Sequence, residues 1–570
     1  MTLVRPAERA WLRLVIFSLA SFFTAFCTPG RADETGAAST ALGARLYLKG
    51  LDAEGLQVRA TIQDGAPLSG PRLGCVACHR ASGFGSSEGG YYSPPINGPT
   101  LFSPRQLDRA RFLANRFEQA QPQRYRIRLS QPHMRPAYTQ ETLARALRSG
   151  IDPAGQPLDP AMPRYDLKDA DVTNLAAYLN DLSSQIDAGV TQEEIHFATF
   201  VSQDAPQRQR AAMISTIEAY FEWFNKISRG DRSRVGFSPY HRSETIGSSR
   251  EWRLHIWELK GPPESWPEQL ERFYTAQPVF AVVSGLVEGS FQPAAEFCEK
   301  KNLPVLFPNT ELPATDLATP GHVFYFSRGV ELEAQGFAAY LASLAEPPRA
   351  VLQIVGPGPV ANAAAAAFSR DMRTRLPSAT IRQVDLRGEG LDEKPFDAVT
   401  TFADVILIWP GHAPDASLGS LIEQAPKTAT ILLPSDALEF AKTQLPADSI
   451  RHLKLAYPYE MPGVTHPLSY RVRAWMRTRG LEIDEPRLQF QTYFALSLLD
   501  AAMGRLLSDF HRDYLIETIE HEADGDLNPG VFPSLSLGPW QRFASKGVRI
   551  VRVDPTAEEG ISGESDWIVP

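Results

Sequence analysis

Apolar positions follow two different periods along this chain, and the change falls near residue 190. Before that point, apolar residues recur every three or four positions, which is the period of a helix with one buried face. The clearest such helix begins at Asp169 and Asp171, and two acidic residues in a first turn suit the helix dipole. Its apolar face consists of Val172, Leu175, Ala176, Leu179 and Leu182.

Two shorter helices are predicted upstream by their end signals. One covers residues 41–49 and stops at Gly50, and the other begins after Thr139 and stops at Gly150. Between them, residues 82–104 are rich in Gly and Pro. Such a composition disfavours regular structure and suits a chain that wraps around a flat group.

After residue 190, short apolar runs of the strand type alternate with helical patterns. This alternation predicts parallel, doubly wound sheets of an α/β fold. The remaining length exceeds what one such sheet usually holds, so we expect two lobes. The predicted strands cover residues 195–201, 254–259, 278–284, 303–307, 350–355, 379–384, 404–409 and 429–433, and the predicted helices cover residues 211–225, 266–276, 293–301, 360–376 and 418–424.

Composition adds limits on class and partners. The chain has 570 residues, 43% hydrophobic and 22% charged, which is typical of a globular protein with more than one domain. Its formal net charge of −9 makes nucleic acid and anionic membrane poor partners.

The first residues have the features of an export signal. Three arginines precede a short apolar run over residues 14–26. Gly30-Arg31-Ala32 then forms a small-x-small pattern, which predicts cleavage before Asp33. The run is too short to span a bilayer, which takes about 20 apolar residues. We predict a signal peptide over residues 1–32, a periplasmic mature chain without a membrane span, and two parts over residues 33–187 and 190–570.

The most specific motif is Cys75-Val76-Ala77-Cys78-His79. Two thiols three positions apart can bond to the two vinyl groups of one porphyrin, and the adjacent His can place a ring nitrogen on the iron. A structural zinc site would need four ligands, and no second Cys-x-x-Cys occurs in the chain. A redox dithiol does not require the adjacent His. Covalent haem attachment is therefore the favoured interpretation.

Residues 33–187 resemble the class I cytochromes c. The resemblance implies an all-α domain with one covalent haem c, held by Cys75 and Cys78, with His79 as the proximal iron ligand and Met162 as the distal one. It also implies that the first and last helices cross. The motifs that carry it are Gly43-x-x-Leu46-Tyr47, the haem motif, Asn97-Gly98-Pro99, Met162-Pro163 and Ala176-Ala177-Tyr178-Leu179.

Two other side chains compete for the distal position. Met134 and His133 lie in a Pro-bounded loop, and the 83 positions from His79 to Met162 show that the intervening region is enlarged. If His79 and Met162 both bind, the iron is six-coordinate and has no open position, and such ligation raises its reduction potential. These properties favour an electron carrier over an enzyme.

Residues 190–570 resemble the type I periplasmic binding proteins, the family of branched-chain amino-acid receptors. The resemblance implies a ligand between two lobes, at the carboxyl ends of the parallel strands. The segments that carry it cover residues 279–285, 290–294, 303–310, 323–326, 335–336, 404–409 and 432–436. One departure is the loop over residues 356–359, Gly-Pro-Gly-Pro, which supplies no aromatic side chain to the second lobe.

Carried over position by position, the resemblance implies that six residues contact the ligand. Hydroxyls and backbone N–H groups at helix starts suit a carboxylate, and an acidic side chain suits an amine. The serines among them can equally be ordinary helix caps. The six residues are Ser284, Gly285, Ser290, Asn309, Thr310 and Asp436.

Together these patterns predict a periplasmic c-type cytochrome fused to a small-molecule-binding module. We expect it to exchange electrons with a protein partner, as part of a periplasmic dehydrogenase or respiratory chain. The alternative is a solute receptor, of the ABC-transporter or sensory type, with a haem redox module. The expected ligand is amino-acid-like or another small metabolite.

Overall fold

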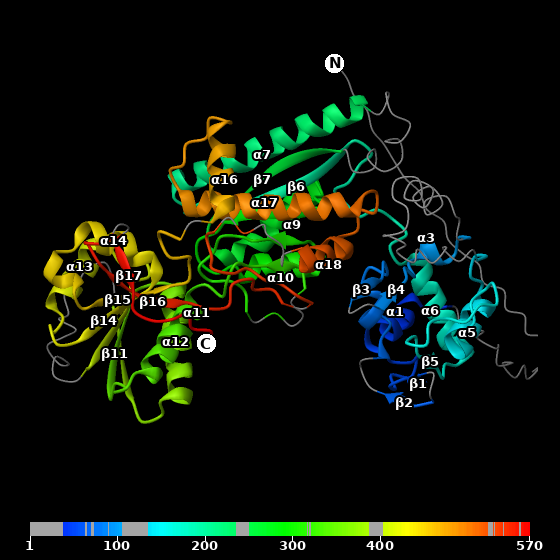
Figure 1. The fold of residues 1–570 in the computed structure, drawn as a ribbon, viewed down its shortest axis with the longest axis horizontal. Coiled ribbons are helices and arrows are strands. Elements are labelled where there is room, and N and C mark those ends of the chain that lie inside the picture. The colour runs from blue at the N-terminus through cyan, green and yellow to red at the C-terminus, as the bar shows by residue number, and fades with distance from the viewer. Residues whose placement is uncertain are drawn as a thin grey trace, which may run out of the picture.

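The computed structural model describes residues 38–570 except 63–64, 70–72, 89–90, 105–134, 235–249, 316, 318–320, 387–402, 465, 523–527, 529, 540 and 558–559. The predicted signal peptide with Cys27, and the candidate ligands Met134 and His133, lie outside these residues. Figure 1 shows a small N-terminal part and two larger lobes, with the first lobe in the middle. No helix among the described residues is long and apolar enough to cross a membrane.

The N-terminal part is built on two crossing helices. They are α1 (Thr40–Lys49) and α6 (Asp169–Asp181), and α5 (Gln140–Ser149) packs beside α6. At the crossing, a Cβ atom on Gly43 would lie 2.1 Å from the carbonyl oxygen of Asn174. The predicted crossing is confirmed, and Gly43 lies where no side chain would fit.

Short strands accompany these helices, so the expectation of an all-α domain is not confirmed. Strand β1 (Arg59–Thr61) pairs antiparallel with β2 (Pro67–Ser69) and with β5 (Arg164–Tyr165). A separate hairpin joins β3 (Ser86–Glu88) and β4 (Tyr91–Ser93). Each strand has only two or three residues, too few to produce a visible two-residue period in the sequence. Two short helices, α2 (Val76–His79) and α3 (Gly98–Leu101), complete this part.

The first lobe contains a parallel five-stranded sheet in the order β10-β9-β8-β6-β7. Helices α7 (Gln207–Arg234), α9 (Trp266–Ala276) and α10 (Gln292–Lys300) belong to it. The strands are β6 (Glu194–Ser202), β7 (Glu251–Leu259), β8 (Ala281–Leu286), β9 (Val305–Leu306) and β10 (Val323–Phe324).

The second lobe contains a seven-stranded sheet in the order β12-β11-β13-β14-β15-β16-β17, of which the first five strands are parallel. The strands are β11 (Ala350–Val355), β12 (Thr380–Asp385), β13 (Val405–Trp409), β14 (Thr430–Leu433), β15 (Leu453–Tyr457), β16 (Arg549–Val553) and β17 (Ile561–Gly563). Its helices include α11 (Val330–Ser343), α12 (Pro359–Arg375), α13 (Asp415–Gln424) and α14 (Leu438–Gln444).

The chain passes between the lobes after β10, after β15 and again before β16. The second passage returns α16 (Pro467–Arg477), α17 (Pro486–Leu506) and α18 (Arg512–Glu522) to the first lobe, where α17 packs on α7 and β8. Figure 1 shows these three helices, coloured orange, beside green elements of much earlier sequence. The lobes are thus interleaved in sequence, and the carboxyl ends of β10 and β15 lead into segments that join them.

Candidate functional sites

The haem motif lies between two braced points of the backbone. Before it, the hydroxyl of Tyr165 donates to the carbonyl oxygen of Leu73 at 3.1 Å. After it, the hydroxyl of Tyr47 donates to the carbonyl oxygen of Arg80 at 2.5 Å. Both tyrosines are buried, and Tyr47 comes from α1. The motif is therefore held at each end by a helix-and-strand scaffold formed elsewhere in the chain.

The ring of His79 is oriented by a backbone carbonyl. His79 is 5% exposed, and its Nδ1 lies 2.9 Å from the carbonyl oxygen of Pro94. A carbonyl can only accept, so Nδ1 carries the proton and Nε2 keeps its lone pair. Burial lowers the pKa of His79, against a smaller opposing effect of the bond to Pro94, which favours the neutral ring that can bind a metal.

The other predicted haem residues gather in one apolar cluster. Cys75 and Met162 both pack against the core that includes Leu46 and Leu175. Burial raises the pKa of the Cys75 thiol to about 12, while Cys78 is exposed. The backbone of Met162 is fixed, because its N–H donates to the carbonyl oxygen of Asp159 at 3.0 Å.

These residues fit a covalently bound haem. Two thiols flank one turn, a ring nitrogen is free, and a thioether shares the same apolar surroundings. Among the described residues, no group of three or more His, Cys, Asp or Glu side chains could hold a metal ion, so no competing metal centre is present there. Cys75 and Cys78 would hold the group and His79 would bind its iron, with Met162 as the predicted distal ligand. A bound haem supplies one-electron chemistry at its iron.

Three of the six predicted ligand-binding residues lie inside or at the edge of the first lobe. Ser284 is fully buried, and its hydroxyl lies 3.3 Å from that of Thr492 on α17. Gly285 packs against Phe200. The side-chain amide of Asn309 donates to the carbonyl oxygen of Gly285 at 2.9 Å, while its Oδ1 is buried without a hydrogen-bond partner among the described residues.

The other three end the strands or begin the helices around the junction of the lobes. The hydroxyl of Ser290 accepts from the N–H of Gln292 at 3.3 Å, but Phe291 occupies the N-cap position of α10, so Ser290 is not the helix cap. The hydroxyl of Thr310 accepts from the N–H of Leu312 at 3.3 Å. Asp436 follows β14 and is exposed, although protein atoms crowd around it. Asp436 is the only charged residue among the six.

Two further carboxylates face Asp436 from the first lobe. Glu288 follows β8 and Glu311 follows β9. The nearby charge of Asp436 raises the pKa of both side chains. Burial raises the pKa of Glu311, and the neighbouring charges of Asp436, Glu288 and Glu333 raise it further. The Glu311 side chain is nevertheless open to water. Glu311 therefore combines an exposed side chain with the nearby charges of Glu288 in the first lobe and of Asp436 in the second.

One cation, Arg487, acts on the same acids and lowers the pKa of Glu311 and of Asp436. The guanidinium of Arg487, on α17, lies 4.3 Å from the ring centroid of Tyr459. The phenol of Tyr459, more than any other group, raises the pKa of Arg487, and Glu333 also raises it. Within the described part of the chain, none of Glu288, Glu311, Asp436 and Arg487 forms an ion pair with a protein side chain. The group thus presents charges from both lobes that no side chain neutralises directly.

Comparison with known proteins follows the same division. Residues 63–183 match the family model for cytochrome c. This part of the chain is a cytochrome c domain. No curated protein matches the chain. Membership of the cytochrome c family implies a covalently bound haem, which agrees with the fit of the residues above.

The rest of the chain has the fold of the type I periplasmic binding proteins. A branched-chain amino-acid ABC transporter protein from Thermus thermophilus, with bound valine, matches with a TM-score of 0.50 at 13% identity, over 67% of this chain and 98% of that one. A possible leucine/isoleucine/valine-binding protein from Rhodopirellula baltica SH 1 has a TM-score of 0.49 at 14% identity, over 67% and 98%. A periplasmic binding protein type 1 from Bordetella pertussis Tohama I has 0.48 at 12%, over 66% and 100%.

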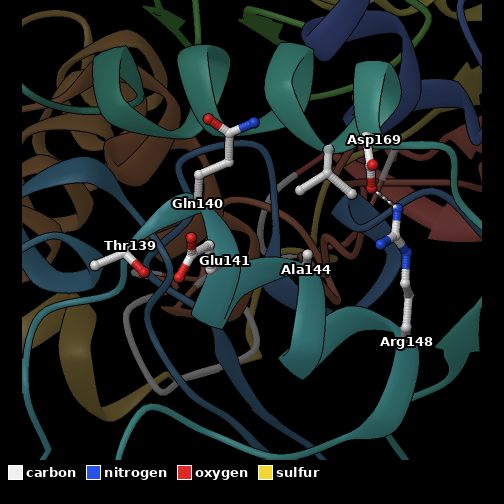
Figure 2. A pocket seen from close by; sticks show the side chains of 7 residues that line it. Thr139, Gln140, Glu141, Ala144, Arg148 and Asp169 are labelled. Atoms are coloured by element: carbon white, nitrogen blue, oxygen red, sulfur yellow. Dashed lines mark hydrogen bonds and ion pairs between the residues drawn. The ribbon is translucent and has the colours of Figure 1, made fainter.

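A separate hollow of about 800 Å³ opens on the cytochrome c domain, between α5 and α6. Figure 2 shows Arg148 reaching Asp169 at its edge, and this ion pair has an N–O distance of 2.6 Å. Gln140 and Glu141 line its other side. These side chains come from the outer surface of the domain and include none of the predicted haem residues, so we assign this hollow no part of the haem site.

Sequence reasoning missed Glu288, Glu311 and Arg487. The two acids could have been predicted from the sequence. Ligands bind at the carboxyl ends of parallel strands, and this rule applies to all the residues that follow β8 and β9. Glu288 lies between the predicted Gly285 and Ser290, and Glu311 follows Thr310. Arg487 gave no local signal, since only the return of α17 to the first lobe brings it to the junction.

Proposed function

We propose that this protein is a periplasmic electron carrier in which a c-type haem is fused to a small-molecule-binding module. The orientation of His79 by Pro94 within a Cys-x-x-Cys-His motif is the observation that carries the proposal. It provides a neutral ring with a free Nε2, which is what a proximal iron ligand requires. The electrons would pass to or from a periplasmic dehydrogenase or another respiratory protein.

The same geometry supports a carrier rather than an enzyme. With His79 and Met162 on opposite sides, the iron would have no position for a substrate or for oxygen. The apolar surroundings of Met162 favour a neutral thioether ligand, and such ligation raises the reduction potential.

The ligand assignment is tested by absorption spectroscopy of the ferric protein. We expect a sulfur-to-iron charge-transfer band that Met162→Ala abolishes, with faster binding of cyanide. Met461→Ala is the matched control, because Met461 is a half-buried methionine that packs in the core of the second lobe. A band that survives in Met162→Ala would show that another residue is the distal iron ligand. A substitution of Met134 would then be tested first.

The binding module would hold its ligand between the lobes, beside the charged side chains that meet there. Glu288, Glu311 and Asp436 offer carboxylates to an amine, and Arg487 offers a guanidinium to an acidic group. These facing charges favour a small zwitterionic or amine-bearing metabolite. They also support the second candidate function, a transport or sensory receptor whose haem reports the redox state.

Thermal-shift screening of the haem-loaded protein tests this module. The panel would contain amino acids, amines, short carboxylates and alcohol-derived metabolites, since a ligand that binds only the folded state raises its unfolding temperature. We expect Glu311→Gln to weaken the stabilisation and Glu423→Gln, an exposed position on α13, to leave it unchanged. Stabilisation that is equal in the two variants would place the ligand elsewhere.

Periplasmic location follows from the predicted signal peptide and from haem attachment outside the cytoplasm. Cell fractionation of the full-length protein tests it. We expect the haem-bearing protein in the periplasmic fraction, with a mass that corresponds to loss of residues 1–32. Retention of that segment would show that the cleavage site is wrong.

A further inference from the structure

A helix of the binding module clamps the chain just after the haem motif. Glu517, on α18, accepts a hydrogen bond from the N–H of Ser82 at 2.9 Å and a second from the Ser82 hydroxyl. Ser82 is fully buried. It lies three positions after His79, so this carboxylate holds the backbone one short turn away from the proximal ligand.

An aromatic contact reinforces the clamp. The ring of Phe84 stacks on that of Tyr514 with 4.4 Å between centroids, and it lies 5.6 Å from the ring of His511. Tyr514 and Glu517 are three positions apart on α18, so both face the cytochrome c domain from one side of the helix. Together they fix residues 82–84 against the first lobe.

The clamped residues are connected to the carbonyl that orients His79. The carbonyl oxygen of Gly83 accepts from the N–H groups of Ile96 and Asn97, at 2.8 Å and 3.2 Å. Gly85 donates its N–H to the carbonyl oxygen of His79 at 3.1 Å. Residues 82–85 thus fix the place where the loop returns at residues 94–97, and Pro94 within it accepts from the His79 ring.

A close backbone contact makes this loop rigid. A Cβ atom on Gly85 would lie 2.0 Å from the carbonyl oxygen of Ser93, and Gly85 has a φ of +81°. The two arms of the loop therefore touch at the residue before Pro94. A displacement of the first arm would move the second arm and the hydrogen bond to His79 with it.

We propose that α18 of the binding module is part of the haem environment, and that Glu517 and Tyr514 are positioning residues which set the reduction potential by holding the loop that orients His79. The inference rests on the proposed haem site. A haem-free protein, with no Soret absorption, would refute that site, whereas the experiment below requires haem to be present.

The second consequence of the clamp is shielding. The seam between α18 and residues 82–84 excludes water from one side of the haem motif, and burial of a haem favours its less charged, reduced form. Release of the seam therefore lowers the potential through water entry. Weakening the hydrogen bond from His79 to Pro94 acts in the opposite direction, because a ring that donates less strongly to the iron raises the potential. We expect the effect of water entry to be the larger of the two.

The test is potentiometric titration of the haem-loaded, full-length protein at pH 6. We expect Tyr514→Ala, Glu517→Ala and Ser82→Ala each to lower the potential. Ser82→Ala combined with Glu517→Ala should lower it by less than the sum of the two single effects, because both substitutions remove the bond between the Ser82 hydroxyl and Glu517, while Ser82→Ala alone also removes the acceptor of the Phe84 N–H. His521→Gln is the control, since His521 is exposed at the far end of the same helix.

Two further measurements separate positioning from loss of structure. The ferric haem-methyl NMR shifts report the orientation of the proximal ring, and small-angle scattering reports whether the cytochrome c domain remains docked. Altered shifts together with a lower potential in a variant whose domains remain docked support the proposal. If they occur only in variants whose domains separate, undocking rather than positioning accounts for them, and the proposal is overturned. Wild-type potential and wild-type shifts in both Tyr514→Ala and Glu517→Ala would overturn it. If an alanine variant does not accumulate, Tyr514→Leu and Glu517→Gln take its place under the same criteria.

Discussion

Glu333 illustrates how a single buried carboxylate can make stability depend on pH. It is 7% exposed and accepts from both the N–H and the hydroxyl of Ser435, at 2.8 Å and 2.6 Å. Burial raises the pKa of Glu333 to about 8; Asp436 adds to the rise, while the bonds from Ser435 and the charge of Arg487 oppose it. The folded state therefore holds a proton that the unfolded chain releases.

The sign of the effect follows from this difference. The stabilisation is fully present below the unfolded pKa and is lost as the pH rises through the folded value near 8. We predict that Glu333→Gln removes this contribution, so that its free energy of unfolding falls less steeply than wild type between pH 5 and pH 9. Denaturant titration at several pH values gives the difference curve, and Glu423→Gln should reproduce the wild-type curve. A parallel decline in Glu333→Gln would show that Glu333 is already ionised.

Gly43 gives a prediction about packing at one atom. Its missing Cβ would lie 2.1 Å from a carbonyl oxygen and 2.7 Å from the Cβ of Tyr178, and neither can move without separating α1 from α6. We expect Gly43→Ala to destabilise the cytochrome c domain by about 3 kcal/mol. Thermal unfolding followed at the Soret band measures it.

Gly504→Ala provides the comparison for that substitution. Gly504 lies on α17, is exposed, and has no atom within 4 Å of an added Cβ. Alanine there should be neutral or stabilising by about 0.5–1 kcal/mol. Equal stability of the two variants would contradict the close crossing of the helices.

At the residue scale, the sequence yields a specific prediction where the chemistry depends on near neighbours. Cys75, Cys78 and His79 form their motif within five positions, and Gly43 precedes a Leu-Tyr pair whose spacing carries the same resemblance. Glu311 and Asp436 differ, since their charges matter only because the lobes bring them face to face. No local pattern encodes that meeting. Whether the six residues first predicted contact a ligand stays a prediction.

Among the elements, α18 depends on one residue for its position. Arg512 is 5% exposed and begins the helix. Its side chain donates to the carbonyl oxygens of Val279, Phe280, Lys301 and Ala188 and to the hydroxyl of Tyr274, at 2.6 to 3.2 Å. Because these acceptors belong to the linker, to α9, to the residues just before β8 and to the C-cap of α10, one guanidinium joins four segments of the chain.

We predict that Arg512→Met lowers the free energy of unfolding by about 3–5 kcal/mol, because buried acceptors lose their donors. Denaturant unfolding followed by tryptophan fluorescence measures the change. Arg208→Met removes an exposed ion pair with Glu485 and should cost less than about 1 kcal/mol. A similar small cost for Arg512→Met would mean that water replaces the guanidinium.

The bounds of a helix or strand can be predicted from the sequence where its buried and exposed positions form a regular pattern. The predicted bounds of α9 and β11 agree with the structure, because α9 buries a single stripe that includes Trp266 and Leu270, and β11 is buried throughout. No helix or strand is predicted from the sequence after residue 433. There, α17 is buried on several sides, so its apolar residues form no single stripe, and β16 and β17 complete a sheet begun some 200 residues earlier.

At the scale of the whole molecule, the cytochrome c domain is attached to the first lobe. Ser82 and Phe84 contact α18, and the linker residue Asp187 accepts from the backbone N–H of Arg512 at 2.7 Å. Figure 1 shows the second lobe on the far side of the first. A closing movement of the lobes would therefore shift the second lobe relative to the haem and leave the first lobe fixed to it.

This difference can be measured by haem quenching of a fluorescent dye. The dye is placed on a cysteine introduced at Glu268 in the first lobe or at Lys427 in the second, both exposed positions. The native Cys298 will not compete, since it is fully buried and burial raises its pKa. We expect the compound that gives the largest stabilisation in the thermal-shift screen to change quenching at position 427 and leave it unchanged at position 268. A change at position 268 would show that the ligand moves the cytochrome c domain against the first lobe, so that the seam at α18 is itself the moving part.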